Sequence, residues 1–297
     1  MEEGKEPAWG SYKLLDSGGF SRLESLAGTL IQRPAPAAVW GRSLDDSLWS
    51  EAQARFERLA EGKGLWHYAN PQIKSRRFPV EVGGIKFNLQ LTGFGHLGLF
   101  PEQELNWQRL KSKISQWESE QGAVGACSVL NLFAYTGGST MASSIGGAQV
   151  THVDASKTSV DWARENASLN SLSEAPIRWI VDDVTAFVQR QRRRGQRYQG
   201  VILDPPSFGR GPKGQMWRIE EDLGPLLEAI RDLLDPDRAF VLLSSHSPGY
   251  TPTALANILN QAFKPLRGKV HWAEEMLVLD QQAVALPSGA CAWWESD

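Results

Sequence analysis

The amino-acid sequence predicts an α/β protein with two parts. One is a doubly wound, mostly parallel seven-stranded sheet with an antiparallel C-terminal strand pair, and the other is a small strand-rich (α+β) module before it. From residue 127 onward, short apolar segments alternate with amphipathic helical segments, which is typical of parallel sheets. Segments 271–280 and 283–294 follow each other with no helical segment between them. Before residue 95, turn signals separate short strand-like segments.

The N-terminal module is expected to span residues 1–94. Segments 78–82 and 85–91 are separated by Gly83-Gly84, which is a two-residue hairpin signal. Residues 45–60 are expected to form an amphipathic helix, because their apolar side chains recur roughly at helical spacing. The module therefore combines several strands with one helix.

The second domain is expected to span residues 95–297, beginning with a helix from about Pro101 to near Gly122. Strands are then expected at 127–133, 149–154, 177–182, 199–204 and 238–245. The expected helices between them are 138–145, 157–170, 184–194 and 221–234. The carboxyl ends of parallel strands meet at one edge of a sheet, so residues that follow these strands are candidates for a binding site.

Composition excludes several classes of protein. The two cysteines, Cys127 and Cys291, form no CxxC pair, which excludes a disulfide framework and a cysteine-based zinc site and suits a reducing cytoplasm. Lys and Arg number 31 against 34 Asp and Glu, which disfavours a histone-like, charge-driven nucleic-acid binder. No apolar run approaches a membrane span, and the polar N-terminus predicts no signal peptide. We therefore expect a cytoplasmic protein that has no membrane contact.

A nucleoside site is predicted at the ends of the first three strands. Gly137-Gly138 follow the first strand, and Asp154 ends the second strand 17 residues later, where a carboxylate is placed to accept hydrogen bonds from ribose hydroxyls. Asp183 ends the third strand and can accept a hydrogen bond from an adenine amino group. Its neighbour Asp182 is the alternative acceptor, or caps the helix that follows.

The missing phosphate-binding patterns narrow the choice of ligand. The sequence has neither the G-x-G-x-x-G pattern of dinucleotide sites nor the G-x-x-x-x-G-K-[ST] loop. A ligand with a ribose and no phosphate fits better, and S-adenosylmethionine is such a ligand. This favours S-adenosylmethionine over NAD and disfavours a nicotinamide-dependent oxidoreductase.

The fourth strand ends in Asp204-Pro205-Pro206, followed by Ser207-Phe208. Prolines cannot continue a strand ladder and hold the local carbonyl groups in one direction. We interpret the segment as an acceptor cluster for a planar substrate that carries an N–H group, with Phe208 as a stacking face. The alternative is a rigid turn before a surface loop. His246 follows the fifth strand at the same edge and is either a substrate contact or an ordinary loop histidine.

A family resemblance rests on these segments taken together. Their order along the chain resembles class I S-adenosylmethionine-dependent methyltransferases, in particular the branch of large-subunit ribosomal RNA cytosine and guanine methyltransferases. The matching segments are 129–138, 153–157, 162–166, 182–184 and 204–208. The resemblance covers about residues 95–250 and implies a Rossmann-like fold and S-adenosylmethionine as the cofactor.

The resemblance also implies site residues. It implies a cofactor pocket of Phe133, Tyr135, Thr136, Gly137, Gly138, Asp154, Ser156, Asp183 and Asp204. Catalysis is expected at Asp204, Pro205 and Pro206, with Phe208 and His246 as substrate contacts. No metal is expected, since the five histidines show no ligand spacing.

The implied function is methylation of RNA, with ribosomal RNA as the expected substrate. Carbon-5 methylation of a pyrimidine needs a cysteine thiolate, but neither Cys127 nor Cys291 falls in the expected substrate loops 204–215 and 244–252. We therefore expect a nitrogen or oxygen acceptor, most simply a base nitrogen. A methyltransferase for a small molecule or a protein, and an inactive S-adenosylmethionine-binding scaffold, are the alternatives.

Overall fold

The computed structural model describes residues 9–59, 64–122, 125–211 and 214–297, so part of the expected loop 204–215 lies outside the described residues. The chain forms two compact units. The first is drawn from Met1–Glu104 and Leu277–Ser288, and the second from Leu105–Met276 and Gly289–Asp297. Among the described residues, no helix is both long and apolar enough to cross a bilayer.

The second unit is built on the predicted sheet, in the order β10-β9-β8-β11-β14-β16-β15. Strands β8 to β11 and β14 pair in parallel, whereas β16 runs antiparallel to β14. This confirms the predicted doubly wound sheet with an antiparallel C-terminal pair. The strands are β8 (Ser128–Leu132), β9 (Gln149–Asp154), β10 (Ile177–Val181), β11 (Gly200–Leu203), β14 (Phe240–Ser245), β15 (Gly268–Leu279) and β16 (Ala285–Ser296).

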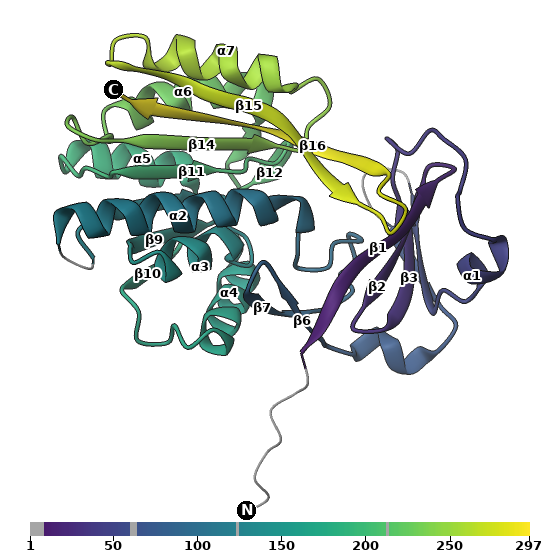
Figure 1. Cartoon of the computed structure of the whole chain (residues 1–297). Helices are drawn as coiled ribbons and strands as arrows, with labels where there is room; N and C mark the ends of the chain where they lie inside the picture. The colour runs from purple at the N-terminus through teal and green to yellow at the C-terminus, as the bar shows by residue number, and fades with distance from the viewer. Residues whose placement is uncertain (1–8, 60–63, 123–124, 212–213) are drawn as a thin grey trace, which may run out of the picture. The chain divides into compact units, whose positions relative to one another are not determined.

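Helices cover both faces of this sheet, with α2, α3 and α4 on one face and α5, α6 and α7 on the other (Figure 1). Every residue of the central strands β11 and β14 is buried as a result, which explains the apolar runs 201–203 and 240–243 within them. The helix α7 between β14 and β15 was not expected from the sequence. The helices are α2 (Glu104–Gln121), α3 (Gly138–Ile145), α4 (Lys157–Leu169), α5 (Val184–Arg193), α6 (Ile219–Arg231) and α7 (Pro252–Phe263).

The first unit contains a second seven-stranded sheet, in the order β5-β4-β3-β2-β1-β6-β7. The predicted hairpin is present as β6 and β7, which pair antiparallel around the left-handed Gly83 and Gly84. The elements are β1 (Gly10–Gly18), β2 (Ser21–Leu26), β3 (Thr29–Pro34), α1 (Asp46–Ser50), β4 (Ala54–Arg58), β5 (Gly64–Tyr68), β6 (Phe78–Val82) and β7 (Ile85–Leu89), with short 3-10 turns at Pro71–Ser75 and Pro101–Gln103.

The prediction of a helix over 45–60 is wrong beyond Ser50. Only α1 is helical, and β4 follows it with a period of two: Ala54 and Phe56 are buried, while Arg55 and Glu57 are exposed. Phe56 packs on Trp66 of β5, with ring centroids 5.1 Å apart. Cross-strand packing therefore overrides the weak helical spacing of the same side chains.

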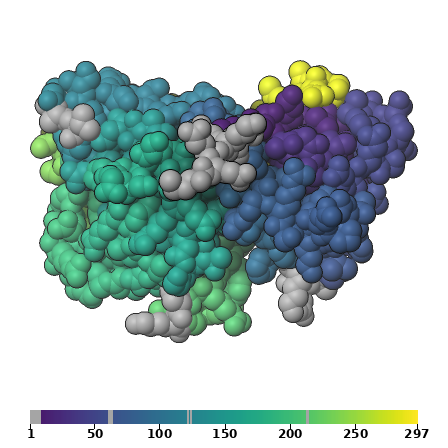
Figure 2. Space-filling model, turned by 90° about the horizontal axis from the view of Figure 1, so that it is seen from below, coloured from purple at the N-terminus to yellow at the C-terminus, as the bar shows by residue number. Residues whose placement is uncertain are grey.

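The tip of the β15–β16 ribbon belongs to the first unit. Val278 and Leu286 are buried in a small core with Leu14, Ala35 and Ala38. In the space-filling view, the yellow atoms of this tip lie beside the purple atoms of the N-terminal strands (Figure 2). Both strands are 12 residues long, so they extend past the edge of the sheet that they close. The division at residue 94 stays a prediction, and the sequence did not indicate this return of the chain.

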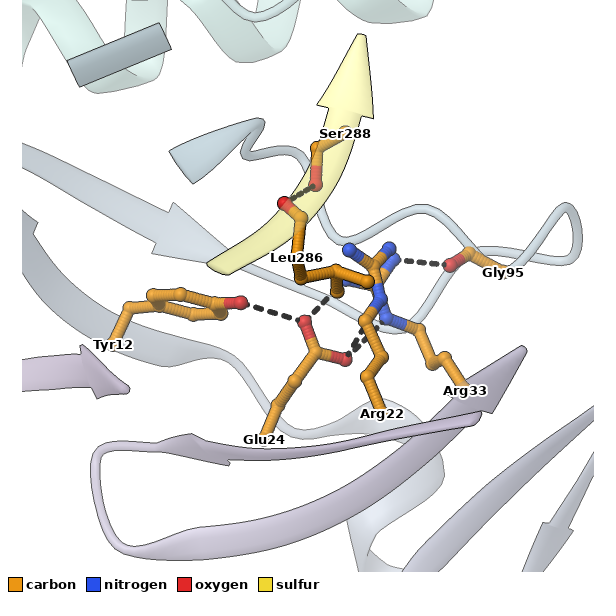
Figure 3. A network of polar contacts seen from close by, with 7 residues as sticks. All are labelled: Tyr12, Arg22, Glu24, Arg33, Gly95, Leu286 and Ser288. Carbon is orange, nitrogen blue, oxygen red and sulfur yellow. Dashed lines mark hydrogen bonds and ion pairs between the residues drawn. The ribbon is translucent and has the colours of Figure 1, made fainter. Parts of the chain in front are cut away.

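A buried ion pair connects the strands of the first unit (Figure 3). Arg33 donates to both carboxylate oxygens of Glu24, at 2.6 and 2.5 Å, and to the carbonyl of Gly95 at 2.9 Å. Tyr12 donates to Glu24 at 2.9 Å, and Arg22 lies 3.7 Å away. Burial raises the pKa of Glu24, but the charges of Arg22 and Arg33 and the hydrogen bonds from Arg33 and Tyr12 outweigh it and lower the pKa to about 2. The pair is tolerated in the core because both charges are matched.

Candidate active site

The loop after β8 holds an unusual backbone. Phe133 has φ 55° and Tyr135 has φ 49°, so two non-glycine residues adopt the left-handed conformation within three positions. Such residues cost about 1–3 kcal/mol each and persist where surrounding contacts hold them, often at ligand sites. Here the backbone N–H of Tyr135 donates to Asp154, and Asn166 donates to the carbonyl of Thr136. The loop that the sequence assigned to the cofactor is therefore held in place by hydrogen bonds to the tip of β9 and to α4.

Glycine is favoured at positions 137 and 138 for two different structural reasons. Gly137 has φ 89° at the start of α3, a conformation that favours glycine. Gly138 allows α2 to approach, because a methyl group there would lie 2.5 Å from the Trp107 ring. Only Gly137 is required by the backbone conformation of the turn itself.

Asp154 lies at the tip of β9. One carboxylate oxygen accepts from Tyr135 N at 2.9 Å and the other from Ser156 N at 2.8 Å. Burial raises the pKa of Asp154, against the lowering effect of these two hydrogen bonds. Each oxygen can accept a second hydrogen bond, so the carboxylate is fixed and retains capacity for a ligand hydroxyl. The side chain of Ser156 caps α4 by accepting from Ser159 N at 3.2 Å.

The two neighbouring carboxylates after β10, Asp182 and Asp183, have different partners. Asp183 caps α5, with Oδ1 accepting from Ala186 N at 2.8 Å. Asp182 forms an ion pair with Arg190 and accepts from Asp183 N at 2.9 Å. The Oδ2 atom of Asp183 faces Gly211, where a methyl group would lie 2.9 Å from it. The capping role that the sequence offered for Asp182 therefore falls to Asp183.

The fourth strand tip brings the predicted acceptor residues together. Asp204 follows β11, and His246 Nδ1 lies 3.2 Å from its Oδ1 atom. Ser207 and Ser247 share a hydrogen bond of 2.7 Å between their hydroxyl groups. The structure therefore joins the segment after β11 to the segment after β14.

A short hairpin after this tip was missed by the sequence analysis. It consists of β12 (Phe208–Arg210) and β13 (Met216–Arg218), paired antiparallel. Trp217 is buried, donates from Nε1 to the carbonyl of Pro206 at 2.7 Å, and packs on Phe133 with ring centroids 4.8 Å apart. The signal in the sequence was the cluster of three glycines and a proline within 209–214, which is typical of a turn between two short strands. Trp217 thus connects the loop after β8 with the tip of β11.

Both cysteine thiols are buried. Burial, with a smaller effect of nearby Glu118 or Glu274, raises the pKa of Cys127 and of Cys291 to about 12. Cys291 pairs with Ser244 in register, so it lies nearer to the active edge than its place in the sequence indicated. A protonated, buried thiol is a poor nucleophile.

Within residues 9–59, 64–122, 125–211 and 214–297, no group of three or more His, Cys, Asp or Glu side chains is arranged to hold a metal ion. The C-terminal edge of the sheet carries three carboxylates, one histidine, a pair of serine hydroxyls and aromatic rings, together with backbone N–H groups. Such a set can bind hydroxyl and amino groups and orient a planar ring.

The chain is similar in sequence and in fold to known proteins. A family model described as S-adenosylmethionine-dependent methyltransferase matches residues 23–262. A crystal structure of an S-adenosylmethionine-dependent methyltransferase from Agrobacterium tumefaciens is 31% identical, with a TM-score of 0.88, and the match covers 98% of this chain and 92% of that one.

Two similar relatives are named for ribosomal RNA. Ribosomal RNA large subunit methyltransferase K/L of Shewanella frigidimarina is 33% identical over 59% of this chain and 23% of its own length. Ribosomal RNA large subunit methyltransferase K of Neisseria meningitidis serogroup B is 29% identical over 70% of this chain and 58% of its own length. The chain therefore spans about a quarter of the length of the first of these two relatives and somewhat over half of the length of the second.

Proposed function

Because the chain belongs to the family of S-adenosylmethionine-dependent methyltransferases, we propose that it methylates a base nitrogen in RNA, with large-subunit ribosomal RNA as the substrate. The family and its cofactor, S-adenosylmethionine, confirm what the sequence predicted. The observation that carries the proposal is the arrangement of Asp204 beside His246, at the same sheet edge as Asp154 and Asp183. The names of the two ribosomal RNA relatives support the choice of substrate.

The residues at the first three strand tips fit this cofactor. Asp154 and Asp183 are held by backbone N–H groups, so their orientation is set before a ligand binds. We assign the ribose hydroxyls to Asp154 and the adenine amino group to Asp183. The remaining wall is assigned to Phe133, Tyr135, Thr136, Gly137, Gly138 and Ser156. We assign Asp204 to the boundary between this wall and the acceptor.

The chain itself contributes position more than chemical activation. S-adenosylmethionine supplies, when bound, a methyl group on a positively charged sulfur that is already activated for transfer. Asp204 accepts an N–H of the acceptor base, orients its nitrogen and receives the proton. Pro205 and Pro206 keep the strand tip rigid, and the Pro206 carbonyl is fixed by Trp217. Orientation of this kind is worth up to about 7–11 kcal/mol of the barrier.

The nitrogen acceptor is supported by the two cysteines. Their buried thiols, with pKa values raised to about 12, leave no thiolate for addition to a pyrimidine ring. A cytoplasmic location, where ribosomal RNA is processed in bacteria, belongs to the same proposal.

Transfer of tritiated methyl groups tests the proposal. The purified chain is incubated with labelled S-adenosylmethionine and with RNA, protein and metabolite fractions from cells that lack it. We expect label in large-subunit ribosomal RNA, with mass spectrometry of nucleosides placing the methyl group on a base nitrogen. Label in protein or metabolites instead would identify the alternative acceptors, and no label in any fraction would favour the inactive scaffold.

A further inference from the structure

The β12–β13 hairpin presents an exposed face next to the Asp204-Pro205-Pro206 segment, and this face includes Phe208, which the sequence analysis expects to contact the substrate. We propose that this face, made of Phe208, Arg210, Met216 and Arg218 and called here the hairpin face, binds a single-stranded segment of RNA next to the methylated base. Bases would stack on Phe208 and Met216, and the two arginines would contact phosphates. This inference rests on the proposed RNA substrate.

The register of the hairpin places these four side chains together. Phe208 is opposite Arg218, and Arg210 is opposite Met216. Directly opposite residues and residues two apart share one side of a strand pair, so all four point the same way. The remaining pair, Gly209 and Trp217, faces inward, and Trp217 is only 7% exposed.

Burial agrees with this division. Phe208 is 52% exposed and Met216 is 48% exposed, and both arginines are exposed as well. Two large apolar side chains in contact with water, flanked by two cations, form a surface suited to a partner with flat rings and negative charges. Single-stranded RNA offers both, because unstacked bases bind aromatic side chains and phosphates bind guanidinium groups.

Two arginines supply the positive charge of the hairpin face. The whole chain carries a net charge of −3, so two arginines on a short hairpin at the active edge differ from its average charge. Arg218 contacts Glu221 at 2.9 Å, and Glu220 and Asp222 also interact with its charge. The Arg218–Glu221 pair is exposed, and such pairs contribute little. A phosphate at Arg218 therefore competes with Glu221 for the guanidinium group.

The hairpin is held next to the acceptor site. Trp217 donates to the Pro206 carbonyl, and Ile219 N donates to the Ser207 carbonyl at 3.1 Å. The hairpin face thus continues from the Asp204-Pro205-Pro206 segment with only Ser207 between them. A base that leaves its helix to reach Asp204 has neighbouring nucleotides, and the hairpin face lies where they can be bound.

Binding of a fluorescent 12-nucleotide single-stranded RNA, and of the same sequence as a duplex, tests the inference in the presence of S-adenosylhomocysteine. Phe208→Ala is expected to weaken binding of the single strand roughly 5- to 150-fold, and Phe208→Trp to preserve it, because stacking on an aromatic ring tolerates any sequence. The double variant Arg210→Gln, Arg218→Gln should reduce the slope of log affinity against log salt by about 1.4.

The matched control is Arg178→Gln, Arg267→Gln, which removes two exposed arginines near the amino ends of β10 and β15, away from the hairpin face. It is expected to leave binding and slope nearly unchanged. Thermal unfolding and S-adenosylhomocysteine affinity show that each variant is folded. The inference is overturned if the hairpin variants bind the single strand as the unsubstituted chain does, if the control loses as much, if the duplex binds better, or if an acidic peptide displaces the RNA more effectively than free RNA.

The two proposals fail separately. If ribosomal RNA accepts the methyl group but the hairpin variants bind and methylate it normally, only the hairpin face is wrong. If no RNA fraction is methylated but the hairpin variants still weaken RNA binding as expected, the hairpin face stands and the proposed methyl acceptor is wrong.

Discussion

The two halves of the active edge differ in how their carboxylates are held. On the β8–β10 half, Asp154 and Asp183 accept hydrogen bonds from backbone N–H groups within 19 residues of themselves. On the β11–β14 half, Asp204 faces His246, which lies 42 positions later in the chain. The first half is thus built from local contacts and the second from contacts between distant segments.

This difference suggests a division of labour. The β8–β10 half is rigid before a ligand arrives, which suits a cofactor common to many methyltransferases. The β11–β14 half carries the exposed hairpin face and the Asp204–His246 pair, which suits the part of the site that distinguishes one acceptor from another. Substitutions in the two halves should therefore separate cofactor affinity from turnover.

The largest effect is expected for Asp204→Ala. It should lower methyl transfer at least roughly 100-fold, because it removes the group that orients the acceptor and receives its proton. Affinity for S-adenosylhomocysteine should change little, as calorimetry can measure, and Asp204→Asn should keep binding of RNA better than Asp204→Ala. Near-normal turnover of Asp204→Ala would remove Asp204 from the catalytic role.

Asp154→Ala tests the other half. It should weaken S-adenosylhomocysteine binding by about 1.5–3 kcal/mol, because a charged acceptor is lost. The turn at Tyr135 loses a hydrogen bond at the same time, which also weakens the cofactor pocket. Cofactor affinity should therefore fall more than the turnover measured at saturating cofactor. Tight binding of NAD with no response to S-adenosylhomocysteine would contradict the assignment of the β8–β10 half to S-adenosylmethionine.

The free energy of unfolding should depend on pH because of a buried histidine in the β8–β10 half. Asn131 donates to Thr140, whose hydroxyl lies 2.9 Å from His152 Nδ1, and burial together with Arg164 lowers the pKa of His152 to about 3. Between pH 6.5 and 3 the unfolded chain binds a proton there that the folded chain does not. Stability should therefore fall as pH drops below 6.5, by about 2 kcal/mol at pH 5.

Urea unfolding at pH 7.5 and pH 5 measures this loss in the unsubstituted chain and in His152→Gln. The variant should show a smaller difference between the two pH values, whatever its stability at pH 7.5. Equal differences in the two proteins would show that other groups cause the acid sensitivity.

A smaller effect is expected where the two halves meet. In Gly211→Ala the new methyl group would lie 2.9 Å from Asp183 Oδ2 and 2.6 Å from Gln215 Oε1, so one of them must move. S-adenosylhomocysteine affinity should fall by about 5-fold, with the fold intact. Gly93→Ala, which meets no atom within 4 Å, is the control. An unchanged affinity in Gly211→Ala would show that Asp183 Oδ2 does not contact the ligand.

The smallest effect on turnover is expected for the double variant Cys127→Ser, Cys291→Ser. Both thiols are buried and their pKa values are raised, so the variant should stay active after a modest loss of stability. A covalent complex of the unsubstituted chain with RNA that contains 5-fluoropyrimidine would instead identify a cysteine nucleophile.

The sequence alone determined the strand–helix alternation of the second unit and the carboxylates at its strand tips. Periodicity, glycine turns and helix caps act over a few residues, so they are legible in the sequence. The helix 138–145 and the acidic tip of β9 are found where they were expected, and the match of segments indicated the family and its cofactor.

Only the tertiary structure decided the remainder. Residues 54–58 form a strand because Phe56 packs on Trp66, the tip of β15–β16 joins the first unit because Val278 and Leu286 find a core there, and Trp217 fixes the hairpin because Phe133 and Pro206 lie beside it. Asp204 and His246 likewise meet only when β11 and β14 pair. Each of these outcomes depends on burial between distant residues, which no local pattern specifies.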